Sequence, residues 1–242
     1  MNSRKLGFFF LALGIFGAGA TTLAESNGFR SNFTSIDTNR WYVSNGWANG
    51  GHQSCEWRAD AISIKDDKLV FTVSDKGGKV RPIGCAEMHS HDRLGTGMYE
   101  ARLRTAAGSG LNTAFFSYIG PSDHEPWDEI DFEFLGKNPG KVEINHTAGG
   151  QKVVGKIVDL GFDSSKDFHD YAFDWSKDGI KWFIDGVKVY ETPKGAPLPT
   201  HPPFMFLELW TGSEQEDSWM GHFDYKEPVT AEFEWTRYTP HP

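Results

Sequence analysis

The sequence predicts an all-β fold, built as an antiparallel sandwich of two sheets or a jelly roll. Apolar and polar residues alternate through much of the 242-residue chain, which is the pattern of strands with one buried face. An Asp-Gly pair stands between two strand-like runs, and no long helical pattern interrupts the series. Short strands separated by Gly- and Pro-rich turns are typical of sandwiches and jelly rolls.

Seven segments carry the alternation. In chain order they cover residues 68–74, 97–105, 129–134, 141–147, 169–176, 180–191 and 231–238. The sixth contains Asp185-Gly186 between two apolar runs, so it predicts a β-hairpin. Residues 192–203 contain five prolines, which lack the N–H that a sheet requires, and we expect a loop there.

The beginning of the chain predicts a signal peptide over residues 1–24. A single domain is expected over residues 25–242. Arg4 and Lys5 precede an uncharged run to about residue 20 that is short for a membrane span, and small residues then precede Glu25. A retained membrane anchor is the alternative. We therefore expect a secreted protein, extracellular or periplasmic, that leaves the membrane after cleavage.

Composition and charge narrow the class of ligand. The formal net charge of −9 argues against nucleic acid and anionic membranes as partners and favours neutral or weakly charged ligands. Nine Trp, seven Tyr and 19 Phe exceed what an average core needs. We expect most of these rings in the core and some as platforms on which sugars stack.

Cys55 and Cys85 predict one disulfide bond. A secreted chain folds in an oxidising compartment, where two cysteines most simply pair with each other. Neither cysteine has a close second ligand at zinc-finger spacing, which disfavours a metal site.

The segment WDEIDFEFLG, residues 127–136, crowds acids among large apolar side chains. In a strand, Glu129, Asp131 and Glu133 share one face, while the apolar residues that alternate with them share the other. The row of like charges has no interleaved Lys or Arg, so an ordinary solvent-facing strand, the simplest alternative, would gain nothing from it. The pattern therefore favours a groove that uses the acids.

Paired carboxyl groups in a groove are suited to glycoside hydrolysis. A retaining enzyme needs one ionised carboxylate to attack the anomeric carbon and one protonated carboxyl to release the leaving oxygen. On a flat strand the Cα atoms of Glu129 and Glu133 would be about 13 Å apart, so the sheet must curve for both to reach one bond. Asp131 lies between them and would couple to both titrations.

Five segments resemble bacterial lichenases, the endo-1,3-1,4-β-glucanases of glycoside hydrolase family 16: WANGGHQSCEWRA, GCAEMHS, WDEIDFEFLG, KVEINHTAGG and DLGFDSSKDFHDYAFDWSKDGIKWFIDG. The resemblance extends over about residues 29–238. It implies the family's curved jelly roll with a concave substrate cleft, and it matches the family's disulfide to Cys55 and Cys85. Secreted glycanases that process succinoglycan are similar as well.

The resemblance also implies roles for single residues. Glu129 matches the family's nucleophile, Asp131 its assisting acid and Glu133 its general acid/base; the one-residue spacing after Asp131 favours the lichenase branch over laminarinase-like relatives. Matching substrate-binding positions are Asn49, Glu87, Trp127, Asn145, Trp210 and Trp219. The alternatives are a core position for each tryptophan and a solvated edge position for Glu87.

The chain departs from the lichenase pattern in its cleft. His89 stands where lichenases usually carry Arg, Glu208 replaces an Asn, and His146 and Thr147 replace tyrosines. These changes put unsubstituted cereal glucan in doubt as the natural substrate. No cofactor is required for the expected chemistry; a structural calcium remains open at Glu234, where relatives usually carry Asp.

Three functions follow as hypotheses. The first is a secreted retaining endo-β-glycanase that acts on β-1,3-1,4-glucan or a related exopolysaccharide such as succinoglycan. The second is a transglycosylase that passes the same glycosyl-enzyme to another sugar. The third is a non-catalytic polysaccharide-binding sandwich, which the three adjacent acids disfavour. In each case the partner is a polysaccharide, and we expect a monomer.

Overall fold

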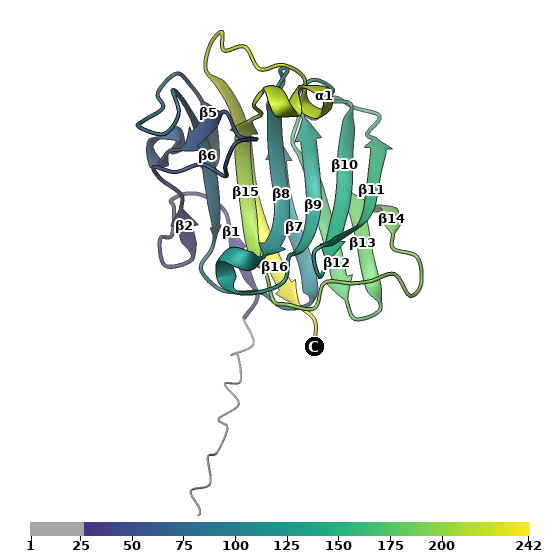
Figure 1. The fold of residues 1–242 in the computed structure, drawn as a ribbon. Helices are drawn as coiled ribbons and strands as arrows, with labels where there is room; N and C mark the ends of the chain where they lie inside the picture. The colour runs from purple at the N-terminus through teal and green to yellow at the C-terminus, as the bar shows by residue number, and fades with distance from the viewer. Residues whose placement is uncertain (1–26) are drawn as a thin grey trace, which may run out of the picture.

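The computed structural model describes residues 27–242, and it places the strands β1 to β16 in two stacked sheets of eight strands each (Figure 1). We name them the β12 sheet and the β9 sheet. In spatial order the β12 sheet contains β14 (Val187–Glu191), β13 (Gly179–Ile184), β12 (His169–Ser176), β7 (Gly97–Arg104), β16 (Val229–Pro240), β5 (Lys68–Val73) and β4 (Ile62–Lys65), and β1 (Phe29–Ser31) pairs with β16. The predicted sandwich is confirmed.

The β9 sheet has the same construction. Its order is β11 (Gln151–Asp159), β10 (Lys141–Ala148), β9 (Asp128–Leu135), β8 (Leu111–Ile119), β15 (Phe204–Thr211), β6 (Ile83–Ser90) and β2 (Trp41–Val43). The short strand β3 (Cys55–Trp57) pairs with β6 in parallel, whereas the neighbours on the main path are antiparallel. Sequence neighbours β8, β9, β10 and β11 form a meander, and β15 enters between β8 and β6 from far along the chain.

Helices are few and short. The 3-10 turns η1 (Ala59–Ala61), η2 (Pro121–Asp123) and η3 (Glu214–Glu216) and the single-turn helix α1 (Asp217–Met220) lie in connections between strands. From residue 27 onward, no helix has the length and apolar character needed to cross a membrane. The expected signal peptide, residues 1–24, lies outside the described residues.

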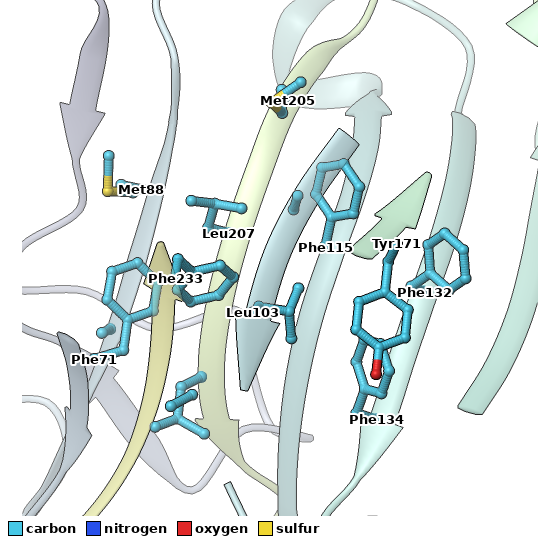
Figure 2. Packing of buried hydrophobic residues seen from close by; sticks show 14 of the residues in the cluster. Phe71, Met88, Leu103, Phe115, Phe132, Phe134, Tyr171, Met205, Leu207 and Phe233 are labelled. Carbon is cyan, nitrogen blue, oxygen red and sulfur yellow. The ribbon is translucent and has the colours of Figure 1, made fainter. Parts of the chain in front are cut away.

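The core lies between the two sheets and is rich in aromatic rings (Figure 2). Phe132 and Phe134 of β9 meet Tyr171 of β12, with ring centroids 5.6 and 4.6 Å apart. The largest fully buried side chains are Trp41, Trp57, Trp182, Tyr99, Tyr171, Tyr238, Phe71, Phe115, Phe132, Phe134, Phe173 and Phe233. Each such ring removes a large apolar area from water, so the aromatic content serves mainly the sandwich.

All seven segments predicted as strands are strands, with ends shifted by one or two residues. Strands β6, β8 and β15 were not predicted, and neither were β11 and the short strands β1, β2, β3 and β4. Most residues of β6, β8 and β15 are buried on both faces. Residue type therefore does not alternate along them, and a pattern of period two is absent.

The predicted hairpin is confirmed at β13 and β14. Ile184 pairs with Val187, so Asp185 and Gly186 alone form the turn. Their φ angles are 48° and 76°, in the left-handed region that a two-residue type I′ turn requires. The right-handed twist of the flanking strands matches this turn.

The proline-rich connection, residues 192–203, contains no strand, as predicted, and it holds the start of β9 in place. The backbone N–H groups of Thr200 and His201 donate to the Asp128 carboxylate at 2.8 and 3.0 Å, and Gly149 N–H donates to it at 2.7 Å. Asp128 is buried, and these bonds, against its burial, hold its pKa below the usual value. The acid is a structural anchor directly beside Glu129.

The predicted disulfide between Cys55 and Cys85 is present and joins β3 to β6. The two Cα atoms are 5.8 Å apart and both sulfurs are buried. The side-chain amide of Gln53 lies 3.5 and 3.3 Å from the two sulfur atoms. The bridge thus supports the segment that precedes β3.

Replacing both cysteines by serine should lower the free energy of unfolding. The bridge closes a loop with a sequence separation of 30, for which the chain-entropy account gives roughly 3 to 4 kcal/mol. Urea unfolding of the oxidised protein, the reduced protein and the C55S/C85S double variant would measure the difference. Equal midpoints for all three would mean that the bridge contributes nothing to stability.

Candidate active site

Strand β9 presents its three alternate acids to the outer face of the β9 sheet. Glu129 and Glu133 are half-buried and Asp131 is 6% exposed. Phe132 and Phe134 point into the core (Figure 2), and they are buried there together with Ile130. The face assignment predicted from the strand period is confirmed.

The acids line the floor of an open cleft of about 670 Å³. The other lining residues are Trp47, Asn49, His52, Gln53, Glu87, His89, Ala114, Phe116, Tyr118, Ser122, Asp123, Trp127, Phe204, Phe206, Glu208 and Trp210. Many are aromatic, and in the part of the chain that the structure describes none of the lining residues is Lys or Arg. A neutral, polyhydroxylated ligand fits such a surface better than an anionic one.

Strand register arranges the cleft in cross-strand rows, because paired residues of an antiparallel sheet lie side by side on one face. The Asp131 row runs Asn145, Asp131, Phe116, Phe206, His89 and Tyr42. The Glu133 row runs Glu143, Glu133, Ala114, Glu208 and Glu87. An aromatic row and an acidic row therefore lie next to each other across the sheet.

Each outer acid of the trio has its own hydrogen-bond donors. The indole N–H of Trp127 donates to Glu129. Glu133 accepts from the amide of Asn145 at 2.7 Å and from that of Asn112 at 3.2 Å. These donors fix both carboxyl groups in orientation.

Burial gives the three acids raised pKa values. Burial raises the pKa of Glu129, although bonds from Trp127 and Asp131 and the charge of Lys152 oppose the rise. Burial, followed by the negative charges of Glu129 and Glu133, raises the pKa of Asp131 well above its usual value. Because neighbouring carboxylates cannot all ionise cheaply, the trio holds protons at neutral pH.

The pKa of Glu133 is raised as well. Burial, then the negative charges of Glu129 and Glu143, raises the pKa of Glu133 to about 8, against the bond from Asn112 and the charge of Lys152. Glu133 is therefore protonated at neutral pH. Both outer acids accept hydrogen bonds that favour the ionised form, but acidic neighbours add to the rise in the pKa of Glu133, whereas bonds from Trp127 and Asp131 oppose the rise at Glu129.

The structure places the predicted binding residues in two groups. Asn49, Glu87, Trp127 and Trp210 line the cleft, and their binding of substrate stays a prediction. Asn145 is buried and acts on Glu133 through its hydrogen bond instead of lining the cleft.

Trp219 lies apart from the main cleft. It borders a second pocket of about 280 Å³ that reaches Glu133 from the side of β10 and β11. Its indole N–H donates to Glu143 at 3.1 Å, and its ring lies 6.2 Å from that of Trp210. Trp219 therefore lies between the second pocket and Trp210, which lines the main cleft.

Several residues at the site were not predicted from the sequence. Phe116 and Tyr118 come from β8, and Phe204 and Phe206 come from β15, two strands without an alternating pattern. Asn112 and Lys152 were missed because their relation to the acids depends on strand pairing: Lys152 is opposite Thr147, which in turn is opposite Glu129. The strand register between β9, β10 and β11 is the information from which the position of Lys152 near the acids could have been predicted.

A structural calcium at Glu234 stays a prediction. This residue lies on β16, in the sheet opposite the acids, and accepts from the guanidinium of Arg102 at 2.7 Å. The arginine already neutralises the carboxylate that a cation would need. Across residues 27–242, no group of three or more His, Cys, Asp or Glu side chains is arranged to hold a metal ion.

Comparison with known proteins identifies the family. Residues 49–236 match the glycosyl hydrolases family 16. The chain is 41% identical over 211 residues to an endo-1,3-1,4-beta-glycanase, ExoK, of Rhizobium meliloti, covering 87% of this chain and 78% of the relative. It is 36% identical over 233 residues to a beta-glucanase of Bacillus subtilis, covering 95% and 93%.

Solved structures agree with the sequence comparison. A prokaryotic beta-1,3-1,4-glucanase (lichenase) derived from a mouse hindgut metagenome superposes with a TM-score of 0.84 at 38% identity, covering 89% of this chain and 100% of that one. The acid-bearing strand β9 lies inside the matched family region, residues 49–236. The chain is a glycoside hydrolase, and it belongs to glycosyl hydrolase family 16.

Proposed function

We propose that the protein is a retaining endo-β-glycanase that hydrolyses β-1,3-1,4-glucan or a related exopolysaccharide by double displacement. The observation that carries this proposal is the pair Glu129 and Glu133 in an open cleft: hydrogen bonds oppose the rise in the pKa of Glu129, whereas burial and acidic neighbours raise the pKa of Glu133 to about 8. An open cleft suits attack within a long polymer. The names of the relatives, an endo-1,3-1,4-beta-glycanase and a beta-glucanase, support the substrate class.

In the first step Glu129 acts as nucleophile. Its carboxylate oxygen forms a bond to the anomeric carbon while the bond from that carbon to the leaving oxygen breaks. The indole N–H of Trp127 orients the attacking group. Asp131, whose pKa is raised by burial and by its two acidic neighbours, holds a proton that it donates to Glu129. Asp131 thereby orients the nucleophile and limits repulsion within the trio.

Glu133 acts first as acid and then as base. Its proton passes to the leaving oxygen, which departs as a sugar hydroxyl. In the second step Glu133 takes a proton from water, the hydroxide oxygen bonds to the anomeric carbon, and Glu129 leaves as a carboxylate. The bonds from Asn112 and Asn145 hold Glu133 in place through both steps.

The remaining expectations complete the proposal. Removal of residues 1–24 would release residues 25–242 as one domain, secreted to the periplasm or the medium, and its disulfide suits an oxidising compartment. The proposed chemistry needs no cofactor, and the monomer suffices because β9 alone supplies the catalytic trio.

Incubation with a panel of polysaccharides tests the substrate. We expect new reducing ends from barley-type mixed-linkage glucan or from succinoglycan, and few or none from laminarin. Added cellobiose as acceptor measures transglycosylation, which would appear as longer products. Release of reducing ends from laminarin alone would contradict the assignment.

Rescue of inactive variants by azide distinguishes which of Glu129 and Glu133 is the nucleophile and which is the acid/base. Glu129→Ala and Glu133→Ala should each lower kcat by about two orders of magnitude or more. With Glu129→Ala, azide should attack from the vacated side and give the α-glycosyl azide. With Glu133→Ala and an activated aryl glycoside, azide should attack the glycosyl-enzyme and give the β-glycosyl azide. NMR of the products distinguishes them, and the opposite anomers would reverse the roles.

The pH profile should respond to charges beside Glu133. Since Glu133 must be protonated, kcat/KM should fall as the pH rises through about 8. The charge of Glu143 raises this pKa and that of Lys152 lowers it. Glu143→Gln should therefore move the alkaline limb to lower pH, and Lys152→Gln should move it to higher pH. Shifts in the same direction, or none, would mean that another group controls the limb.

A further inference from the structure

Two buried carboxyl groups that do not belong to the catalytic trio lie directly opposite each other in the cleft. Glu87 on β6 pairs across strands with Glu208 on β15, and they are 2% and 6% exposed. Both line the cleft. Like charges at directly opposed positions repel, so two carboxylates here would destabilise the sheet.

Within residues 27–242, no lysine or arginine lines the cleft to relieve this repulsion. The titratable groups that face the pair are Glu129 and Glu133 from β9, His89 from β6 and His52 from the segment before β3, while β8 contributes the uncharged Ala114. Of the cleft-lining residues in the described chain, none is Lys or Arg. A proton is the remaining way to lower the negative charge.

Hydrogen bonds indicate which carboxyl group holds the proton. The hydroxyl of Ser44 donates to Glu87, which favours the carboxylate form there. Glu87 and Glu208 are also hydrogen-bonded to each other, and this bond needs a proton from one of them. Burial and then the charge of Glu87 raise the pKa of Glu208 well above its usual value. Glu208 is accordingly the donor.

A buried acid elsewhere in the same sheet shows what a purely structural glutamate looks like. Glu56 on β3 is 1% exposed and accepts from the backbone N–H groups of Val80 and Arg81 at 2.6 and 2.8 Å. Arg58 lies 3.4 Å from it as well. Glu87 and Glu208 lack such a set of protein donors within the described residues, and they border the cleft instead.

We infer that Glu87 and Glu208 form a carboxylic acid–carboxylate pair that shares one proton and binds the hydroxyl groups of an uncharged sugar residue, with Glu208 as a specificity-determining residue. Glu208 lies two strands from Glu133 in the same row, about 10 Å at the usual strand spacing, so this sugar is not the one whose bond is cleaved. The inference rests on the proposed function and names the sugar chemistry at one position of the cleft.

The pair also explains which sugars this position of the cleft would accept. Its remaining lone pairs accept from sugar hydroxyls, and its net negative charge disfavours a carboxylate substituent at the same place. A site built to hydrogen-bond a hydroxyl discriminates strongly against a sugar whose hydroxyl is blocked, because its own polar groups are then left unpaired. Any substituents of the polymer must therefore lie elsewhere in the cleft.

Infrared and kinetic measurements on Glu208→Gln test the pair. The absorption of protonated carboxyl groups at neutral pH should lose one component in this variant, and in the wild type that component should disappear as the pH rises. Over the same pH interval, KM for soluble mixed-linkage glucan should rise about tenfold in the wild type, the equivalent of one hydrogen bond. Glutamine cannot lose a proton, so its KM should stay constant there. Glu227→Gln, at an exposed acid before β16, controls for the change in charge.

Three results would overturn the inference. One is an infrared spectrum that Glu208→Gln leaves unchanged at neutral pH. Another is a wild-type KM that stays constant while the infrared component of the protonated carboxyl group disappears with rising pH. The third is a KM for Glu208→Gln that rises together with that of the wild type. If the wild type hydrolyses no polymer of the panel, the proposed function fails, while the infrared comparison still decides whether Glu208 holds the proton.

Discussion

The burial of Ile130, Phe132 and Phe134 between the two sheets is the constraint on which the active site depends. These side chains are almost completely removed from water, and a shift of β9 by one residue would expose them and bury the acids in the core. The hydrophobic energy of the sandwich therefore keeps the Glu129–Glu133 face in the cleft. Asp128, bonded to three backbone N–H groups, holds the same strand at its first residue.

The same burial that positions the acids sets their protonation. Each carboxyl group loses solvation and faces acidic neighbours, so the ionised forms are disfavoured: the pKa of Asp131 is raised well above its usual value and that of Glu133 to about 8. The protein limits the cost with amide donors to Glu133, an indole donor to Glu129 and the distant charge of Lys152. Chemistry and stability oppose each other here, because a raised pKa means that the folded state loses stability as the pH rises.

Departures from the lichenase pattern fall into the two cross-strand rows. His89 lies in the aromatic row, with its ring 4.7 Å from Phe206 and 4.9 Å from Tyr42. Glu208 lies in the acidic row beside Glu87. One substitution replaces an expected cation with a ring that extends an apolar surface, and the other adds an acid where an amide is usual. Together they make this side of the cleft more aromatic and more acidic without changing the trio.

Local sequence determined the strands with alternating residues, the Asp185-Gly186 hairpin, the proline-rich loop and the common face of Glu129, Asp131 and Glu133. These features depend on the two-residue period of a strand and on turn geometry, which neighbouring residues specify. Resemblance to a family was needed to propose the order of roles within the trio. The strands β6, β8 and β15 escaped prediction because both of their faces are covered. Only the tertiary structure decided that Glu208 meets Glu87, that Phe206 meets His89 and that Lys152 acts on the acids, because pairing between strands far apart in the chain sets which side chains share a row.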